Sequence, residues 1–71
     1  MAVRLKKRRV RLHLKNDAPS IEGILVGTVD GHYLLKIPRV LKAAGDTISL
    51  DGDVEVPRVN VLFLQRLGGD Q

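Results

Sequence analysis

The sequence predicts an all-β fold, a small and strongly bent barrel of five to six strands. Apolar and polar residues alternate with a period of two through most of the chain, which is the pattern of half-buried strands. Two Asp-Gly pairs mark tight turns, and two glycines inside one strand-like stretch permit sharp bending. Seventy-one residues make one domain. Closing so short a sheet into a barrel would remove its exposed edges.

The first half of the chain predicts three strands. Residues 9–15 (RVRLHLK) alternate strictly, and a turn cluster follows at residues 16–20. Residues 20–29 (SIEGILVGTV) are the second strand, which contains both glycines. The Asp30-Gly31 pair predicts a two-residue hairpin turn, after which residues 32–37 (HYLLKI) form the third strand.

The middle of the chain predicts a helical turn and a second hairpin. Pro38 is expected to end the third strand and to begin one short helical turn at residues 38–44, which Gly45 would cap. Residues 47–56 predict a hairpin around Asp51-Gly52, in which the apolar residues of the two strands face each other.

The end of the chain completes the predicted barrel. Residues 57–60 are expected to bend, as a short 3₁₀ turn, and residues 61–67 (VLFLQRL) are the last strand. We expect residues 1–8 to be a basic N-terminal arm or the bulged start of a strand, and residues 9–71 to be a single barrel domain.

The first fifteen residues are strongly basic. They contain seven basic groups and no acidic one, whereas the rest of the chain is net acidic and the whole has a formal charge of +4. The basic residues are Arg4, Lys6, Lys7, Arg8, Arg9, Arg11 and Lys15. They predict a partner, which is either an acidic protein surface (a second copy of the chain included) or nucleic acid. The third alternative is a solvated edge strand whose charge blocks aggregation.

No pattern in the chain indicates catalysis. There is no cysteine, and His13 and His32 lie far apart in the sequence, so no metal site is expected. Asp30, Gly31 and His32 form a turn, and no serine has the context of a nucleophile. We therefore expect no enzyme, no cofactor and no small-molecule substrate. Without an apolar run of about 18 residues or a secretory signal, we expect no membrane contact and an intracellular protein.

Two stretches resemble the motifs of the Sm-like family. Residues 21–35 (IEGILVGTVDGHYLL) resemble the first Sm motif, and residues 55–64 (EVPRVNVLFL) resemble the second. The resemblance implies a bent Sm-like barrel, similar in shape to an SH3 barrel. It also implies RNA binding by a polar residue shortly after the aspartate and by an Arg-Gly pair before the last strand. This chain departs from that pattern, because it has Leu34 at the first position and Pro57-Arg58-Val59 at the second.

The resemblances leave two functions open. The whole pattern is similar to small virion proteins of tailed phages of actinobacteria. That similarity implies a non-enzymatic, multimeric accessory component of a phage particle, either capsid-associated or a minor structural protein. It would be made in the host cytoplasm and would bind major capsid or other virion subunits. The alternative is a cytoplasmic Sm-like ring that binds RNA, with contacts from Asp30, His32, Tyr33, Arg58 and Asn60. In both, we expect an oligomer edge at Val61, Leu62, Phe63 and Leu64.

Overall fold

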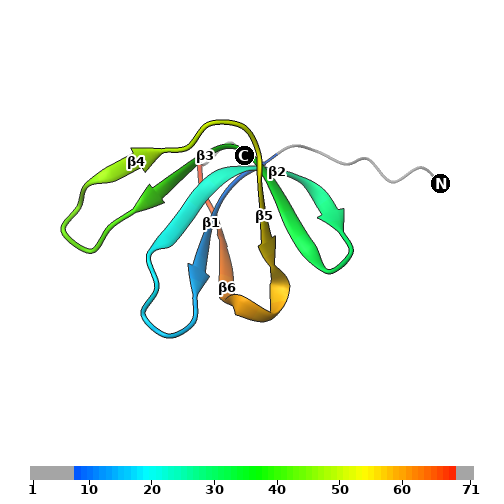
Figure 1. Cartoon of the computed structure of the whole chain (residues 1–71), viewed down its shortest axis with the longest axis horizontal. Helices are drawn as coiled ribbons and strands as arrows, with labels where there is room; N and C mark the ends of the chain where they lie inside the picture. The colour runs from blue at the N-terminus through cyan, green and yellow to red at the C-terminus, as the bar shows by residue number, and fades with distance from the viewer. Residues whose placement is uncertain (1–7, 69–71) are drawn as a thin grey trace.

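The computed structural model describes residues 8–68, and over that range it is an all-β fold, as predicted. The only helical segment in this part of the chain is one 3₁₀ turn, and none is long and apolar enough to cross a membrane. The elements in Figure 1 are β1 (Arg8–Leu14), β2 (Ser20–Val29), β3 (His32–Leu41), β4 (Thr47–Ser49), β5 (Val54–Pro57), η1 (Arg58–Asn60) and β6 (Val61–Arg66).

All strand pairs are antiparallel, and β3 organises the sheet. The strands follow the order β4-β3-β2-β1-β6, and β5 also pairs with β3. β5 lies along the first half of β3 and β4 along the second half, so the two short strands follow one another on the same edge. The predicted turn at Asp30-Gly31 is confirmed, since Val29 pairs with His32 across it and both turn residues have positive φ.

The predicted hairpin around Asp51-Gly52 is wrong. β4 and β5 do not pair with each other, because each pairs with its own half of β3. The reversal lies instead between β3 and β4, where the Lys42 amide donates to the carbonyl of Asp46 (2.8 Å) and the Gly45 amide to that of Lys42 (2.9 Å). Gly45 has a φ of 98°, so it serves a tight turn and does not cap a helix.

The predicted helical turn at residues 38–44 is also wrong, because β3 continues through Pro38 as far as Leu41. The pairs Ile24–Lys36 and Glu22–Arg39 leave Ile37 and Pro38 together opposite the single residue between them on β2. This is a β-bulge, and a bulge is one of the few places where a strand tolerates a residue without an N–H. Ile37 takes a φ of 51° to form it, and Pro38 is buried.

The core lies on the inner face of the bent sheet. Its buried hydrophobic side chains are Val10 and Leu12 of β1, Leu35 of β3 and Val56 of β5. Each of these strands contributes alternate residues to the core, as the period of two predicts. At the bend of β2, Gly23 lies so close to β3 that an added Cβ would sit 3.0 Å from the carbonyl oxygen of Lys36.

The barrel is open along one side. Within residues 8–68, β6 pairs only with β1, and β4 and β5 pair only with β3, so no ladder joins the two ends of the sheet. The turn η1 connects those ends. It is held by a hydrogen bond from the Arg58 amide to the carbonyl of Gly31 and by one from the Lys15 amide to that of Asn60, each 2.9 Å. Because η1 crosses the end of the barrel between these two hydrogen bonds, β5 lies at one edge of the sheet beside β3. β6 lies at the other edge beside β1, and the two strands do not pair with each other in the described range.

We predict that Gly23→Ala destabilises the fold by about 1–3 kcal/mol, because the new methyl group meets backbone that cannot move independently. Gly27→Ala is the matched control, since nothing lies within 4 Å of its Cβ position. We expect that change to be neutral or to stabilise by about 0.4–1 kcal/mol through the unfolded state. Urea denaturation of both variants checks the prediction, and equal midpoints would contradict the close approach at Gly23.

Candidate functional site

Three turns that are distant in the sequence meet at one end of the barrel, in the lower part of Figure 1. They are the turn between β1 and β2, the turn between β2 and β3, and η1. The two amide-to-carbonyl hydrogen bonds of η1, to Gly31 and from Lys15, join all three. We refer to these three segments as the turn cluster. Such a cluster offers both backbone and side-chain polar groups at one exposed place.

The structure brings together four of the residues implied for RNA contact. Asp30 and His32 flank the hairpin turn, and the Nδ1 atom of His32 lies 2.9 Å from the carbonyl oxygen of Asp30. The Arg58 guanidinium lies over the ring of Tyr33, 5.8 Å from its centroid, which is a cation–π arrangement. Asn60 is exposed at the other end of η1.

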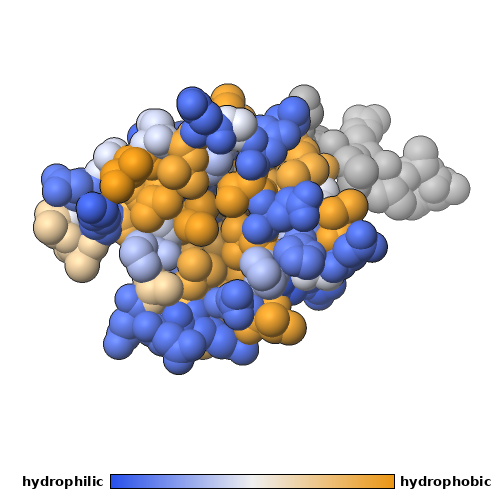
Figure 2. Space-filling model, in the orientation of Figure 1, coloured by the Kyte–Doolittle hydropathy of each residue, from blue (hydrophilic) through white to orange (hydrophobic). Residues whose placement is uncertain are grey.

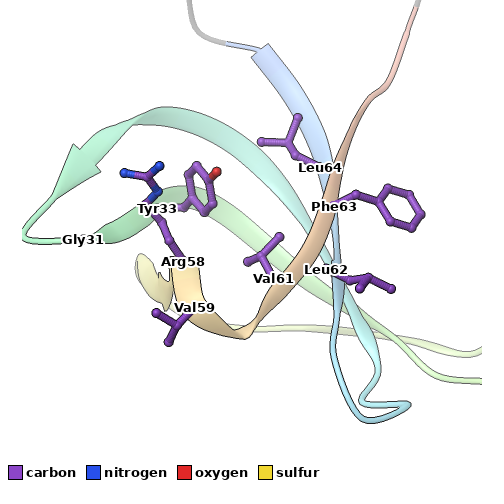
Figure 3. Close-up of a pocket in the computed structure, with 8 residues that line it drawn as sticks. All are labelled: Gly31, Tyr33, Arg58, Val59, Val61, Leu62, Phe63 and Leu64. Carbon is purple, nitrogen blue, oxygen red and sulfur yellow. The ribbon is translucent and has the colours of Figure 1, made fainter.

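A groove of about 460 Å³ lies beside the turn cluster (Figure 3). Tyr33 and Arg58 form one wall and β6 forms the other. The side chains of Val61 and Leu64 point towards Tyr33, whereas those of Leu62 and Phe63 point away from it. The groove is therefore apolar with a single cation at its end, and it follows the open side of the barrel. Figure 2 shows apolar residues gathered over the middle of the visible face, with a hydrophilic band below them.

The predicted oligomer edge lies on β6, which among residues 8–68 has a partner strand on one side only. Within it, Leu62 is 63% and Phe63 is 53% exposed, while Val61 and Leu64 pack against the core cluster. Phe63 is thus a surface residue, because its position on β6 is on the face opposite the core. The interface itself remains a prediction.

The basic N-terminal residues are only partly within the described range. Arg4, Lys6 and Lys7 lie outside it, and so does most of the predicted arm. The other basic residues of this segment belong to β1 and its following turn: Arg8, Arg9, Arg11 and Lys15. All are exposed except Arg11, which is half-buried. Their role in binding a partner remains a prediction.

Sequence reasoning missed a buried carboxylate on the outer face of the sheet. Glu22 is 5% exposed. Its Oε2 accepts two hydrogen bonds from Arg11, of which the one from Nε is 2.9 Å, and its Oε1 accepts one from Arg39 at 2.9 Å. In the sequence Glu22 is an ordinary polar residue of an alternating strand. Only the pairing of β2 with both β1 and β3 places an arginine on each side of it.

Burial and charge act on Glu22 in opposite directions. Burial would raise the pKa of this carboxyl, because it disfavours the charged form. The hydrogen bonds and positive charge of Arg11, and then those of Arg39, outweigh burial and hold the pKa below its ordinary value of 4.5. The carboxylate is therefore ionised at neutral pH, as an anchor for the two arginines. Within residues 8–68 no three His, Asp or Glu side chains come together as a metal site would require.

The fold is similar to that of archaeal Sm proteins of known structure. The SmAP1 heptamer of P. aerophilum matches with a TM-score of 0.75 and 27% identity, over 87% of this chain and 81% of that one. A second heptameric archaeal Sm protein, whose structure was described for its implications for the eukaryotic snRNP core, matches with a TM-score of 0.73 and 26% identity. That match covers 86% of this chain and 87% of the other. No protein-family model matches the sequence, and no curated protein matches it.

These similarities confirm the Sm-like fold and overturn the first functional hypothesis. Both solved structures are heptameric archaeal Sm proteins, which corresponds to the alternative of an Sm-like ring and not to an accessory component of a phage capsid. The expected capsid partners and virion localisation have no support for the same reason. The error came from the overall apolar pattern, which many small bent barrels share whatever they bind.

We predict that the Glu22 anchor makes stability depend on pH. Because the folded-state pKa is lowered, the carboxylate's contribution is present above its unfolded pKa of about 4.5 and is lost as the pH falls through the folded value. Glu22→Gln should cost about 1–3 kcal/mol at neutral pH and should flatten the acid limb of the stability curve. Chemical denaturation at several pH values tests this, with Glu55→Gln as the control at an exposed glutamate. The same acid limb in wild type and Glu22→Gln would show that Glu22 is not the anchor.

Proposed function

We propose that this protein is a non-enzymatic subunit of an Sm-like ring that binds RNA in the cytoplasm. The observation that supports it most is that, in the part of the chain that the structure describes, the bent sheet ends in two unpaired edges next to the turn cluster. These are β6 at one side and β4 with β5 at the other. The similarity to two heptameric Sm proteins supports the same conclusion.

The two edges are suited to pairing between copies. An unpaired strand edge presents backbone N–H and C=O groups that a further strand can satisfy. β6 of one copy and β5 or β4 of the next are different surfaces, so their pairing is heterologous, and a repeated heterologous contact closes into a ring when the rotation allows. Exposed apolar side chains accompany both edges, with Leu62 on β6 and Ile48 on β4. Their burial would add to the small core of the single chain. Seven copies is the number that the two similar structures favour.

The turn cluster is the proposed RNA site of the ring. Single-stranded RNA is held by stacking of splayed bases and by cations that contact its phosphates. The cluster offers the half-buried imidazole of His32 and the exposed guanidinium of Arg58. The sequence lacks an Arg-Gly pair, and Arg58 supplies a cation in the same turn. At the position where the Sm resemblance implies a polar RNA-binding residue, this chain has the apolar Leu34. A base in this site is therefore held by stacking more than by a side-chain hydrogen bond.

We predict that Leu62→Lys lowers the oligomeric state, because it places a charge on the β6 edge where a neighbouring strand would pair. Leu62 is 63% exposed, so the fold of the single chain should persist. Val29→Lys is the control, at a residue that is 44% exposed on β2, which lies between β3 and β1 in the sheet. Light scattering gives the mass of each variant. A wild-type protein that is monomeric, with and without a short oligouridylate, would contradict the ring.

We predict that Arg58→Gln weakens RNA binding. Removing one phosphate contact to a single strand should lower the slope of log affinity against log salt by about 0.7. Arg66→Gln, which removes the same charge from β6, is the control and should leave the slope nearer to that of wild type. Fluorescence anisotropy with oligouridylate at several salt concentrations measures both. If the two variants lose affinity equally, the turn cluster has no special role.

A further inference from the structure

The outer face of the sheet contains a row of polar side chains, three of them charged, aligned across four strands. The register pairs Gln65 of β6 with Arg11 of β1, Arg11 with Glu22 of β2, and Glu22 with Arg39 of β3. We call these four residues the arginine row. The Glu22 side chain is 7% exposed, whereas those of Arg11 and Arg39 are 32% and 42% exposed. The carboxylate thus lies beneath the two guanidinium groups and fixes them.

The two arginines of the arginine row have N–H groups left over that could bind an anion from solvent. A guanidinium has five N–H donors. Arg11 donates two of its hydrogens to Glu22 and Arg39 donates one, so each keeps donors for a further acceptor. Arg9 adds a third positive charge, with a nitrogen 3.9 Å from the same carboxylate and a side chain that is 60% exposed. Three arginines around one carboxylate leave a positive face, and its two central guanidinium groups are already held in position.

An aromatic pair lies one row further along the same face. Phe63 of β6 pairs with His13 of β1, and their rings stack with centroids 4.2 Å apart and planes 18° apart. His13 is held by Gln65 Oε1, 2.8 Å from its Nε2, and by Ser20 Oγ, 3.5 Å from its Nδ1. Phe63 is 53% exposed and points away from the groove by Tyr33 (Figure 3). The pair is therefore a fixed aromatic surface that faces solvent.

A pocket of about 280 Å³ borders both rows. Arg11, His13 and Ser20 line it from β1 and β2, Lys42 lines it directly after β3, and Asp17 lines it from the turn between β1 and β2. It therefore combines two cations, one carboxylate, a hydroxyl group and the edge of the aromatic pair in one depression. Adjacent rows are about 6.6–6.8 Å apart, since they are separated by two residues along each strand.

We propose that this face binds single-stranded nucleic acid, at a site other than the one proposed at His32 and Arg58. A base stacks on the exposed ring of Phe63, and the neighbouring phosphates meet the guanidinium groups of Arg11 and Arg39. Stacking on aromatic side chains beside a positively charged surface is the general way in which proteins hold single strands. An acidic peptide would match the charge but would leave the exposed, fixed aromatic pair without a counterpart.

This site goes beyond the proposed ring function and does not need it. All of its residues belong to one chain. The arginine row and the aromatic pair lie on strands, and only the bordering pocket reaches the turn cluster, through Asp17, Ala18 and Pro19 of the turn between β1 and β2. Pairing of the β6 edge with another copy would use backbone groups in the plane of the sheet, whereas Phe63 and Gln65 project from its outer face beside His13 and Arg11. A ring would then present the face on every subunit.

The test compares Phe63→Leu, Phe63→Tyr, Arg39→Gln and Arg39→Lys in the full chain, by fluorescence anisotropy with short oligouridylate and oligothymidylate. We expect Phe63→Leu to weaken binding by about 5- to 100-fold, as loss of one stacked base does, and Phe63→Tyr to bind like wild type. Arg39→Gln should lower the salt slope by about 0.7, and Arg39→Lys should restore the slope but not the full affinity. If the two oligonucleotides bind equally, the face recognises base and phosphate. If oligouridylate binds more tightly, the face also recognises the ribose.

Two outcomes would overturn the proposal. One is a Phe63→Leu variant that folds and binds as wild type does. The other is competition by polyglutamate as strong as that by unlabelled oligouridylate, which would mean that the face selects charge alone. Light scattering of each variant keeps the two functions apart. Weakened binding by Phe63→Leu in a protein that forms no ring supports the outer-face site without the ring. Weakened binding by Arg58→Gln alone supports the turn cluster and removes the outer-face site.

Discussion

The bend of β3 against Gly23 is the constraint on which the rest of the structure depends. The bulge at Ile37 and Pro38 needs β2 and β3 to approach so closely that a Cβ at residue 23 would lie 3.0 Å from backbone. Because of this bend, one strand pairs along the same edge with both β4 and β5. The curvature also brings alternate residues of β1, β3 and β5 onto one small core. A flat sheet of the same strands would not enclose a hydrophobic core.

The same alternation that builds the core builds the charged outer face. Val10 and Leu12 of β1 are fully buried, and Arg11 between them points to the other side, where it meets Glu22. A buried carboxylate is costly unless its charge is matched and its oxygens are hydrogen-bonded. Arg11 and Arg39 meet both conditions from the neighbouring strands. The carboxylate that holds the two arginines in place also determines how they face solvent, and so it would affect the binding that we propose for this face.

The open side of the barrel links stability to assembly. In the described range the buried apolar core consists of only four side chains and Pro38, while Leu62, Phe63 and Val59 are each more than half exposed. A chain of this size buries a modest fraction of its surface alone, so a neighbour that covers an edge would add a large share of the total burial. The turn η1 holds that side open. Its hydrogen bonds to the turns at Gly31 and Lys15 keep the ends of β5 and β6 apart and gather the turn cluster.

Several local elements could be predicted from residue patterns alone. β1, β2, the Asp30-Gly31 turn, η1 and β6 follow from period-two alternation and turn residues, which act within a few positions. Long-range packing was needed to establish that β3 continues past Pro38, that β4 and β5 pair with β3, and that Glu22 is buried while Phe63 is exposed. The proximity of Gly31 and Arg58 likewise needed the fold, although the resemblance pointed to both turns. The reason is physical: strand partners and the face that becomes buried depend on contacts between distant segments, which no local pattern encodes.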